Sequence, residues 1–170
     1  IAGGEVEMTF TVDLPELGTR AENFGKGNHA TKLKFFVYEY QDENSIGNYL
    51  PEVKFYTADN PAGTNELRSD NKHFDFSLTL IKGMKYNIIF WADKGENSPY
   101  SPEYVNDVPT GVINVNYNNA YANDDTRDAF FGSLKKFDPA AKNAQSRARE
   151  IKLYRPFAQL NAATNDKAAV

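Results

Sequence analysis

Two stretches of this chain alternate apolar and polar residues with a period of two, and this alternation constrains the fold more than any other feature. In the first stretch every second residue from Val6 to Leu14 is apolar, and the positions between them are polar. The stretch from Phe74 to Leu80 follows the same rule. Successive side chains of a strand point to opposite faces, so this period predicts strands with one buried and one exposed face. The residues of the first strand that we expect to face the core are Val6, Met8, Phe10, Val12 and Leu14.

Five further segments have the composition of strands. Residues 33–40 (LKFFVYEY) are apolar on both faces, which is typical of a central strand. Residues 85–93 follow the turn at Lys82-Gly83 and are expected to pair with 74–80 as a hairpin. The other candidates are residues 53–55, 112–117 and 150–160. About seven strands joined by Asn-, Gly-, Pro- and Asp-rich connections predict an all-β fold, a Greek-key β-sandwich of the immunoglobulin-like or transthyretin-like kind.

Two segments are expected to form short helical turns. Asp124, Asp125 and Thr126 have the composition of a helix start and predict a turn that runs through Phe130. Asp138-Pro139 offers an N-cap and a proline at the first helical position, and Ala140, Ala141 and Ala144 follow. Both segments are too short to change the fold class.

Length and composition indicate one β domain that extends over residues 1–162. The chain has 170 residues, of which 41% are hydrophobic, enough for a core of ordinary size. Residues 163–170 are small and polar and are expected to form a tail or a linker. Because the first residue is Ile1 rather than Met, we expect a processed or truncated start.

Composition also excludes several classes of function. The absence of cysteine excludes disulfide scaffolds, thiolate metal sites and cysteine nucleophiles. A net charge of −4 argues against a nucleic-acid binder. No apolar run approaches the roughly 20 residues that a membrane-spanning helix needs.

Signals for catalysis and for metal binding are weak. None of the common nucleotide, zinc-protease or serine-hydrolase motifs is present, and no two carboxylates are marked as a glycosidase pair. His29 and His73 lie in polar contexts and are expected on the surface. A group of Asn and Asp residues between 114 and 128 offers oxygen ligands for calcium, but it lacks the fixed spacing and favours turns instead. We therefore expect no enzyme activity, no metal and no cofactor.

Aromatic residues on the predicted strands support an alternative function. Trp91, Tyr86, Tyr38 and Tyr40 could stack on sugars, although core packing is the more common role of strand aromatics. The alternative is a surface glycan-binding β-sandwich module.

Charge is unevenly distributed along the chain. Residues 96–128 carry six acids and one base, whereas residues 133–155 carry seven bases and two acids. The simpler interpretation is that neighbouring strands compensate one another, and the other is that complementary ends make contacts between copies.

Four segments together resemble a known family. They are MTFTVDLPELGTRA at residues 8–21, IKGMKYNIIFWADKG at 81–95, TRDAFFGSLKKF at 126–137 and IKLYRPFAQLN at 151–161. These segments look like the N-terminal domain of Bacteroidales fimbrillin-like proteins, the type V pilus subunits and related cell-adhesion lipoproteins. The most specific part is Arg155, Pro156, Phe157, Ala158, Gln159 and Leu160, and the resemblance covers nearly the whole chain.

The resemblance implies a structural, cell-surface role. Members of this family are lipoproteins anchored in the outer membrane through a cysteine upstream of the mature domain, and a second β-sandwich domain usually follows. An arginine-specific protease releases the first strand, and a strand from the next subunit replaces it. Here the matching parts are the strand from Val6 to Leu14 and the candidate processing site Arg20. The implied partners are other pilus subunits or the chain's own C-terminal domain, with a host protein or glycan as an adhesion target and the membrane reached only through the anchor.

Overall fold

The computed structural model is an all-β sandwich, as the sequence predicts. It describes residues 4–15, 30–53, 55–56, 66–68, 73–95, 98–118 and 127–156. Within these ranges it has eleven strands and one short helix. Their bounds are β1 Glu5–Asp13, β2 Lys32–Glu39, β3 Asn48–Tyr49, β4 Phe55–Tyr56, β5 Glu66–Arg68, β6 His73–Ile81, β7 Tyr86–Asp93, β8 Tyr100–Val105, β9 Val108–Val115, β10 Phe130–Phe137, α1 Ala144–Arg149 and β11 Ile151–Lys152.

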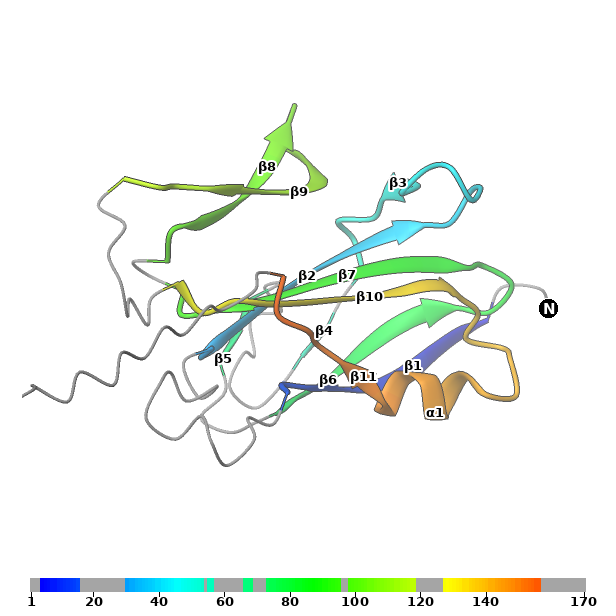
Figure 1. Ribbon diagram of the computed structural model, residues 1–170. Helices are drawn as coiled ribbons and strands as arrows, with labels where there is room; N and C mark the ends of the chain where they lie inside the picture. Colours follow the sequence, from blue (N-terminus) through cyan, green and yellow to red (C-terminus); the bar gives the residue numbers. More distant parts are fainter. Residues whose placement is uncertain are drawn as a thin grey trace, which may run out of the picture.

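The strands form two main sheets and a separate hairpin (Figure 1). The first sheet has the order β11-β1-β6-β4. The second has the order β10-β7-β2-β3, and β5 also pairs with β2. Strands β8 and β9 pair only with each other in the part of the chain described, and they lie as a further layer beyond β2 and β7.

Aromatic rings join the two main sheets. The Phe76 ring of β6 is parallel to the Phe35 ring of β2, with centroids 4.8 Å apart. Phe10 of β1 stacks on Phe76 at 5.5 Å and meets Phe137 of β10 at 5.6 Å. Such ring pairs contribute beyond the apolar area that they bury, so the core is centred on these four phenylalanines.

The second sheet is covered on both faces, which explains why its central strands are apolar throughout. Tyr38 is buried on the outer face of β2, and its hydroxyl donates to the Pro109 carbonyl of β9 at 2.7 Å. Trp91 packs against Tyr100 of β8 with ring centroids 5.2 Å apart. The hairpin β8–β9 therefore covers the outer face of β2 and β7, and the prediction of a central strand at residues 33–40 is confirmed.

A buried carboxylate fixes the start of this hairpin. Asp93 ends β7 and is only 3% exposed. It accepts hydrogen bonds from Trp91 Nε1, from the Gly95 backbone N–H and from Ser98 Oγ, at 2.8–2.9 Å. A buried carboxylate needs this number of donors to offset the loss of water.

The open side of the sandwich is closed by residues 151–154, which we call the closing segment. Val12 and Asp13 of β1 pair in parallel with Ile151 and Lys152. Two residues later, Tyr154 pairs with Phe131 of β10 in the second sheet. One short segment thus connects the edges of both sheets.

Several sequence expectations on local structure need correction. The expected hairpin between residues 74–80 and 85–93 does not form, because β6 pairs with β1 and β4 in the first sheet while β7 pairs with β10 and β2 in the second. The helix starts at Ala144 and not at Asp138, because the Asp138 carboxylate accepts from the Ala140 N–H and caps a turn instead. Phe130 is the first residue of β10 and not the end of a helical turn. Strand β10 itself was not predicted, and of residues 150–160 only 151–152 form a strand within the described part. Residues 124–126 lie outside the described ranges, as does the expected tail at 163–170.

Candidate functional site

The candidate site is the edge of β6 and the adjoining core that strand β1 covers, which we call the groove of β1. All nine residues of β1 pair with β6 in an antiparallel register that places Phe10 opposite Phe76. Met8, Phe10, Val12 and Leu14 are buried, and Val6 is partly buried and packs against the same core. The predicted inward orientation of these five side chains is confirmed, and β1 fills the groove with a continuous apolar row.

The opposite face of β1 is polar and makes cross-strand hydrogen bonds with β6. Thr11 Oγ1 donates to Asp75 Oδ1 at 2.7 Å, and the hydroxyls of Thr9 and Ser77 are 3.4 Å apart. A shift of one residue would exchange the two faces and bury charged and hydroxyl groups. The register of β1 is therefore specified strongly on both faces.

The other edge of β1 is covered much less completely. Its ladder with β11 involves only Val12 and Asp13, together with a hydrogen bond from the Leu153 N–H to the Asp13 carbonyl at 2.9 Å. Helix α1 packs beside β1, and its Ala144 and Ala148 are buried (Figure 1). Residues 5–11 of β1 thus form ladder bonds with one neighbour only among the described strands.

Part of the RPFAQL motif is described, and it adjoins the closing segment. Arg155 Nη1 donates to Asp128 Oδ1 at 2.7 Å, and the guanidinium lies 5.0 Å from the centroid of the Phe130 ring. The second polar atoms of the pair, Asp128 Oδ2 and Arg155 Nη2, are buried and have no hydrogen-bond partner among the described residues. This pair joins the start of β10 to the end of the closing segment.

The remaining predicted site residues are described only in part. Pro156 is in a bend and not in a strand, in agreement with its missing N–H. The motif residues Phe157, Ala158, Gln159 and Leu160 lie outside the described ranges. So does the candidate processing site Arg20, between the described residues 15 and 30.

The aromatic residues considered for sugar binding are mostly buried. Trp91, Tyr86 and Tyr38 are each at most 6% exposed. Burial raises the pKa of Tyr38 to about 12 and also raises the pKa of Tyr86, whose hydroxyl accepts from the Ile81 N–H. These three side chains are part of the packed interior and have no exposed ring face on which a sugar could stack.

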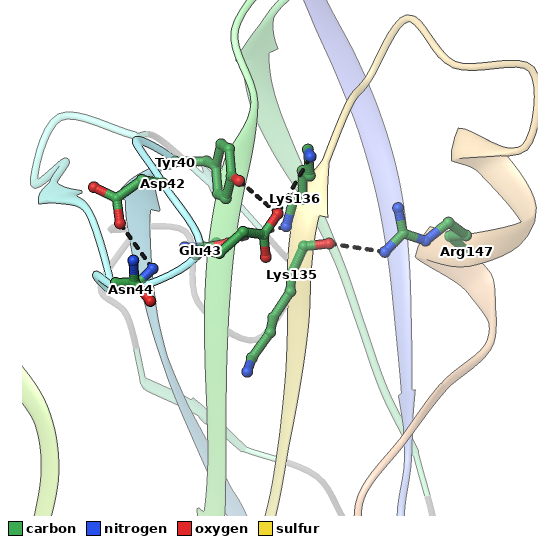
Figure 2. A network of polar contacts seen from close by, with 8 residues as sticks. Tyr40, Asp42, Glu43, Asn44, Lys135, Lys136 and Arg147 are labelled. Atoms are coloured by element: carbon green, nitrogen blue, oxygen red, sulfur yellow. Dashed lines mark hydrogen bonds and ion pairs between the residues drawn. The ribbon is translucent and has the colours of Figure 1, made fainter.

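Tyr40 is the exception, and it belongs to a surface network that the sequence did not reveal (Figure 2). Its hydroxyl donates to Glu43 Oε1 at 2.7 Å, and Lys136 Nζ lies 3.3 Å from the same oxygen. The hydrogen bond from Tyr40, followed by that from Lys136, lowers the pKa of Glu43. Lys136 has a positive φ of 52° at the irregular end of β10, and its backbone N–H there donates to Asn87 Oδ1 at 2.9 Å.

The described residues offer no metal site. No group of three or more His, Asp or Glu residues in these ranges could hold an ion. His73 is on the surface beside Asp75, at 3.2 Å, while His29 lies outside the described part. The Asn116 side chain accepts from the Asn118 N–H at 2.9 Å, which is the turn chemistry that the sequence favoured.

Among the described helices, none has the length and hydropathy to cross a membrane.

Comparison with known families adds one finding to this geometry. The sequence pattern of the family of unknown function DUF6562 matches residues 2–170. The chain belongs to DUF6562. Comparisons with curated proteins and with solved structures found no match. Since the match covers nearly the whole chain, the groove and its strand β1 lie inside the DUF6562 region.

Proposed function

We propose that this DUF6562 chain is a structural subunit of a cell-surface fimbria or adhesin and that it assembles by β-strand complementation. In this proposal the first strand is removed and a strand from a partner fills the groove. The observation that carries it is the asymmetric pairing of β1, which forms a full ladder with β6 but only a two-residue ladder with β11. Removal of β1 would therefore break one long ladder, with β6, and only a two-residue ladder, with β11.

The apolar row explains why the groove would need a replacement strand. Each buried Val, Leu, Met or Phe side chain contributes about 1.5–3 kcal/mol relative to an exposed one. Loss of β1 would expose the partners of its side chains on β6 together with the unpaired N–H and C=O groups of that strand. An extended partner segment can satisfy both, because main-chain bonds supply affinity and alternate side chains supply specificity.

The groove also sets requirements for the incoming strand. It would run antiparallel to β6, as β1 does, and carry apolar residues at every second position. An aromatic residue is favoured opposite Phe76, because Phe10 occupies a site between Phe76 and Phe137. The partner we propose is another pilus subunit or the chain's own C-terminal domain.

The proposal places the protein at the outer membrane, held by a lipid anchor upstream of this chain. Its support is the resemblance of the segments at 8–21, 81–95, 126–137 and 151–161 to fimbrillin-like proteins. No catalytic step is part of the proposal, and Arg20 is the residue at which the first strand would be released.

The test combines cleavage with strand replacement. Limited digestion with an arginine-specific protease should cut first after Arg20 and leave the domain folded around its own strand. A fluorescent peptide that copies residues 4–15 should then exchange into the cut protein and raise its fluorescence anisotropy. A matched peptide with serine in place of Met8, Phe10 and Val12 should not bind, because it lacks the side chains that fill the groove.

The control protein is Arg20→Ala, which should resist the cut and take up neither peptide. Cleavage that starts at Arg147, Arg149 or Arg155 would remove the support for processing. Equal uptake of the two peptides by the cut protein would contradict groove filling.

A further inference from the structure

Among the described residues, two groups of exposed apolar side chains lie outside the core and the groove of β1. The first, which we call the hairpin tip, consists of Val105, Val108 and Val112, each 44–57% exposed. Tyr104 is not part of it, because its ring lies on the other face of the hairpin, edge-on to the buried Phe36 ring with centroids 6.4 Å apart. The second, which we call the aromatic face, consists of Phe131 and Tyr154, which are 44% and 62% exposed. Exposed apolar patches with a polar rim commonly mark interaction surfaces.

The aromatic face is held rigidly. Phe131 and Tyr154 are direct cross-strand partners, and two hydrogen bonds of 2.8 Å between their backbones fix them. The side chains of such a pair lie on the same face of the ladder, about 5 Å apart at Cβ. Lys152 is two residues before Tyr154, and Lys135 is four residues after Phe131. Every second residue of a strand lies on the same face, so both exposed lysines lie on the face of the aromatic pair.

The hairpin tip is equally well defined. Asn106 and Asp107 both have positive φ, 51° and 63°, and this places a type I′ turn between Val105 and Val108. Residues 98–118 contain two acids, Glu103 and Asp107, and no base. The hairpin tip is thus apolar, and the charged residues of its hairpin are both acidic.

The basic charge near the aromatic face is only partly compensated within the molecule. Lys136 pairs with Glu43, and Arg155 pairs with Asp128. Among the described residues Lys135 and Lys152 form no ion pair, and neither do Lys142 and Arg149. Lys135 lies within electrostatic reach of Glu43, but Lys136 already binds that carboxylate. The aromatic face therefore presents unpaired positive charge beside an apolar pair.

We propose that the hairpin tip of one copy of this chain docks on the aromatic face of another copy. The two patches complement each other in both respects that govern recognition, since each offers exposed apolar side chains and their rims carry opposite charge. Tyr154 and Phe131 form the rigid aromatic centre of the contact, and Lys135 and Lys152 face the acidic rim of the tip. The contact is heterologous, because two different surfaces of the chain meet. It uses neither β1 nor its groove, so it is independent of strand exchange.

The experiment uses the intact, uncut chain and measures self-association by analytical ultracentrifugation over a concentration series at low and high salt. Wild type should associate at low salt and dissociate as salt screens the exposed charges. Two charge-reversal variants test the pairing directly. The face-negative variant is Lys135→Glu with Lys152→Glu, and the tip-positive variant is Val105→Lys with Val108→Lys.

Each variant alone should associate at least about tenfold more weakly than wild type, because like charges then meet at the contact. A mixture of the two should associate again, because the unchanged tip of the face-negative variant can dock on the unchanged face of the tip-positive variant, and the positive tip can also meet the negative face. The control matched to the face-negative variant is Lys82→Glu with Lys85→Glu. It changes net charge by the same amount as that variant, but at the turn between β6 and β7, and it should behave as wild type.

Four outcomes would overturn the proposal. They are a wild type that stays monomeric at its highest soluble concentration in low salt, a face-negative variant that associates as wild type does, a control that loses association equally, and a mixture that does not associate. Failure here leaves strand exchange untouched, because the peptide assay with the cut protein reports on a different surface.

Discussion

At the scale of single residues, Phe10 is the side chain on which the groove of β1 depends most. It is fully buried, stacks on Phe76 and meets Phe137, so it contacts both sheets. Phe10→Ala should lower the free energy of unfolding by about 3–5 kcal/mol, measured by urea denaturation, because it leaves a cavity between the sheets. The matched control is Thr9→Ala on the opposite face of β1, which should cost less than about 1 kcal/mol. Equal losses for the two variants would contradict the orientation of β1.

A second residue-scale prediction concerns the pH dependence of stability. Burial raises the pKa of Tyr38 from 10.0 to about 12. The unfolded chain therefore loses this proton near pH 10 while the folded chain keeps it, so the stabilisation is fully present below pH 10 and is lost as the pH rises towards 12. Tyr38→Phe has no proton to lose, and its free energy of unfolding should fall by about 2–3 kcal/mol less over this range. Urea denaturation at a series of alkaline pH values checks this, and parallel pH profiles of the two proteins would contradict it.

The orientation of single residues could be predicted where it depends on local pattern alone. The alternation in 6–14 is sufficient to place Phe10 inside, because a strand has only two faces. The ion pair between Asp128 and Arg155 could not be predicted, since its partners are 27 residues apart and meet only when the closing segment crosses to β10. The same holds for Asp93, whose burial depends on the fold of the segment that follows it.

At the scale of elements, the closing segment depends on a glycine in β10. A Cβ on Gly132 would lie 2.7 Å from Leu153 Cδ2 and 3.2 Å from the Lys152 carbonyl oxygen. Gly132→Ala should therefore displace the closing segment and lower the free energy of unfolding by about 1–3 kcal/mol in urea denaturation. Ser133→Ala is the matched control, because Ser133 is the exposed neighbour on the same strand. A Gly132→Ala protein as stable as this control would show that the closing segment adjusts without loss.

The elements that sequence pattern missed share a physical cause. Strand β10 contains Gly132 and two adjacent lysines, and its ladder with β7 is irregular between Leu134 and Phe137. Its apolar positions therefore do not alternate over a length that pattern can detect. Helix α1 begins later than expected because Asp138 caps a turn, and it has only two buried residues, Ala144 and Ala148. Such a short helix forms through packing and not through propensity.

At the scale of the whole molecule, β1 and the closing segment connect the two sheets, because adjacent residues of the closing segment bond to different sheets. The Leu153 N–H donates to the Asp13 carbonyl of β1, whereas the Tyr154 N–H donates to the Phe131 carbonyl of β10. Two neighbouring amides thus report on different sheets. If β1 leaves the groove, Leu153 loses its acceptor and Tyr154 keeps its own.

Hydrogen exchange by NMR on the protein cut after Arg20 checks this expectation. Once β1 has been displaced, the Leu153 amide should exchange much faster, while the Tyr154 amide and the amides of the ladder between β2 and β7 should stay protected. A saturating peptide that copies residues 4–15 should restore the protection of Leu153, because it offers the same carbonyl at position 13. Loss of protection at both amides together would mean that the closing segment leaves with β1, and then strand exchange would have to rebuild this whole side of the sandwich. Unchanged protection at Leu153 after β1 has been displaced would contradict the prediction, because this amide would then not depend on the Asp13 carbonyl.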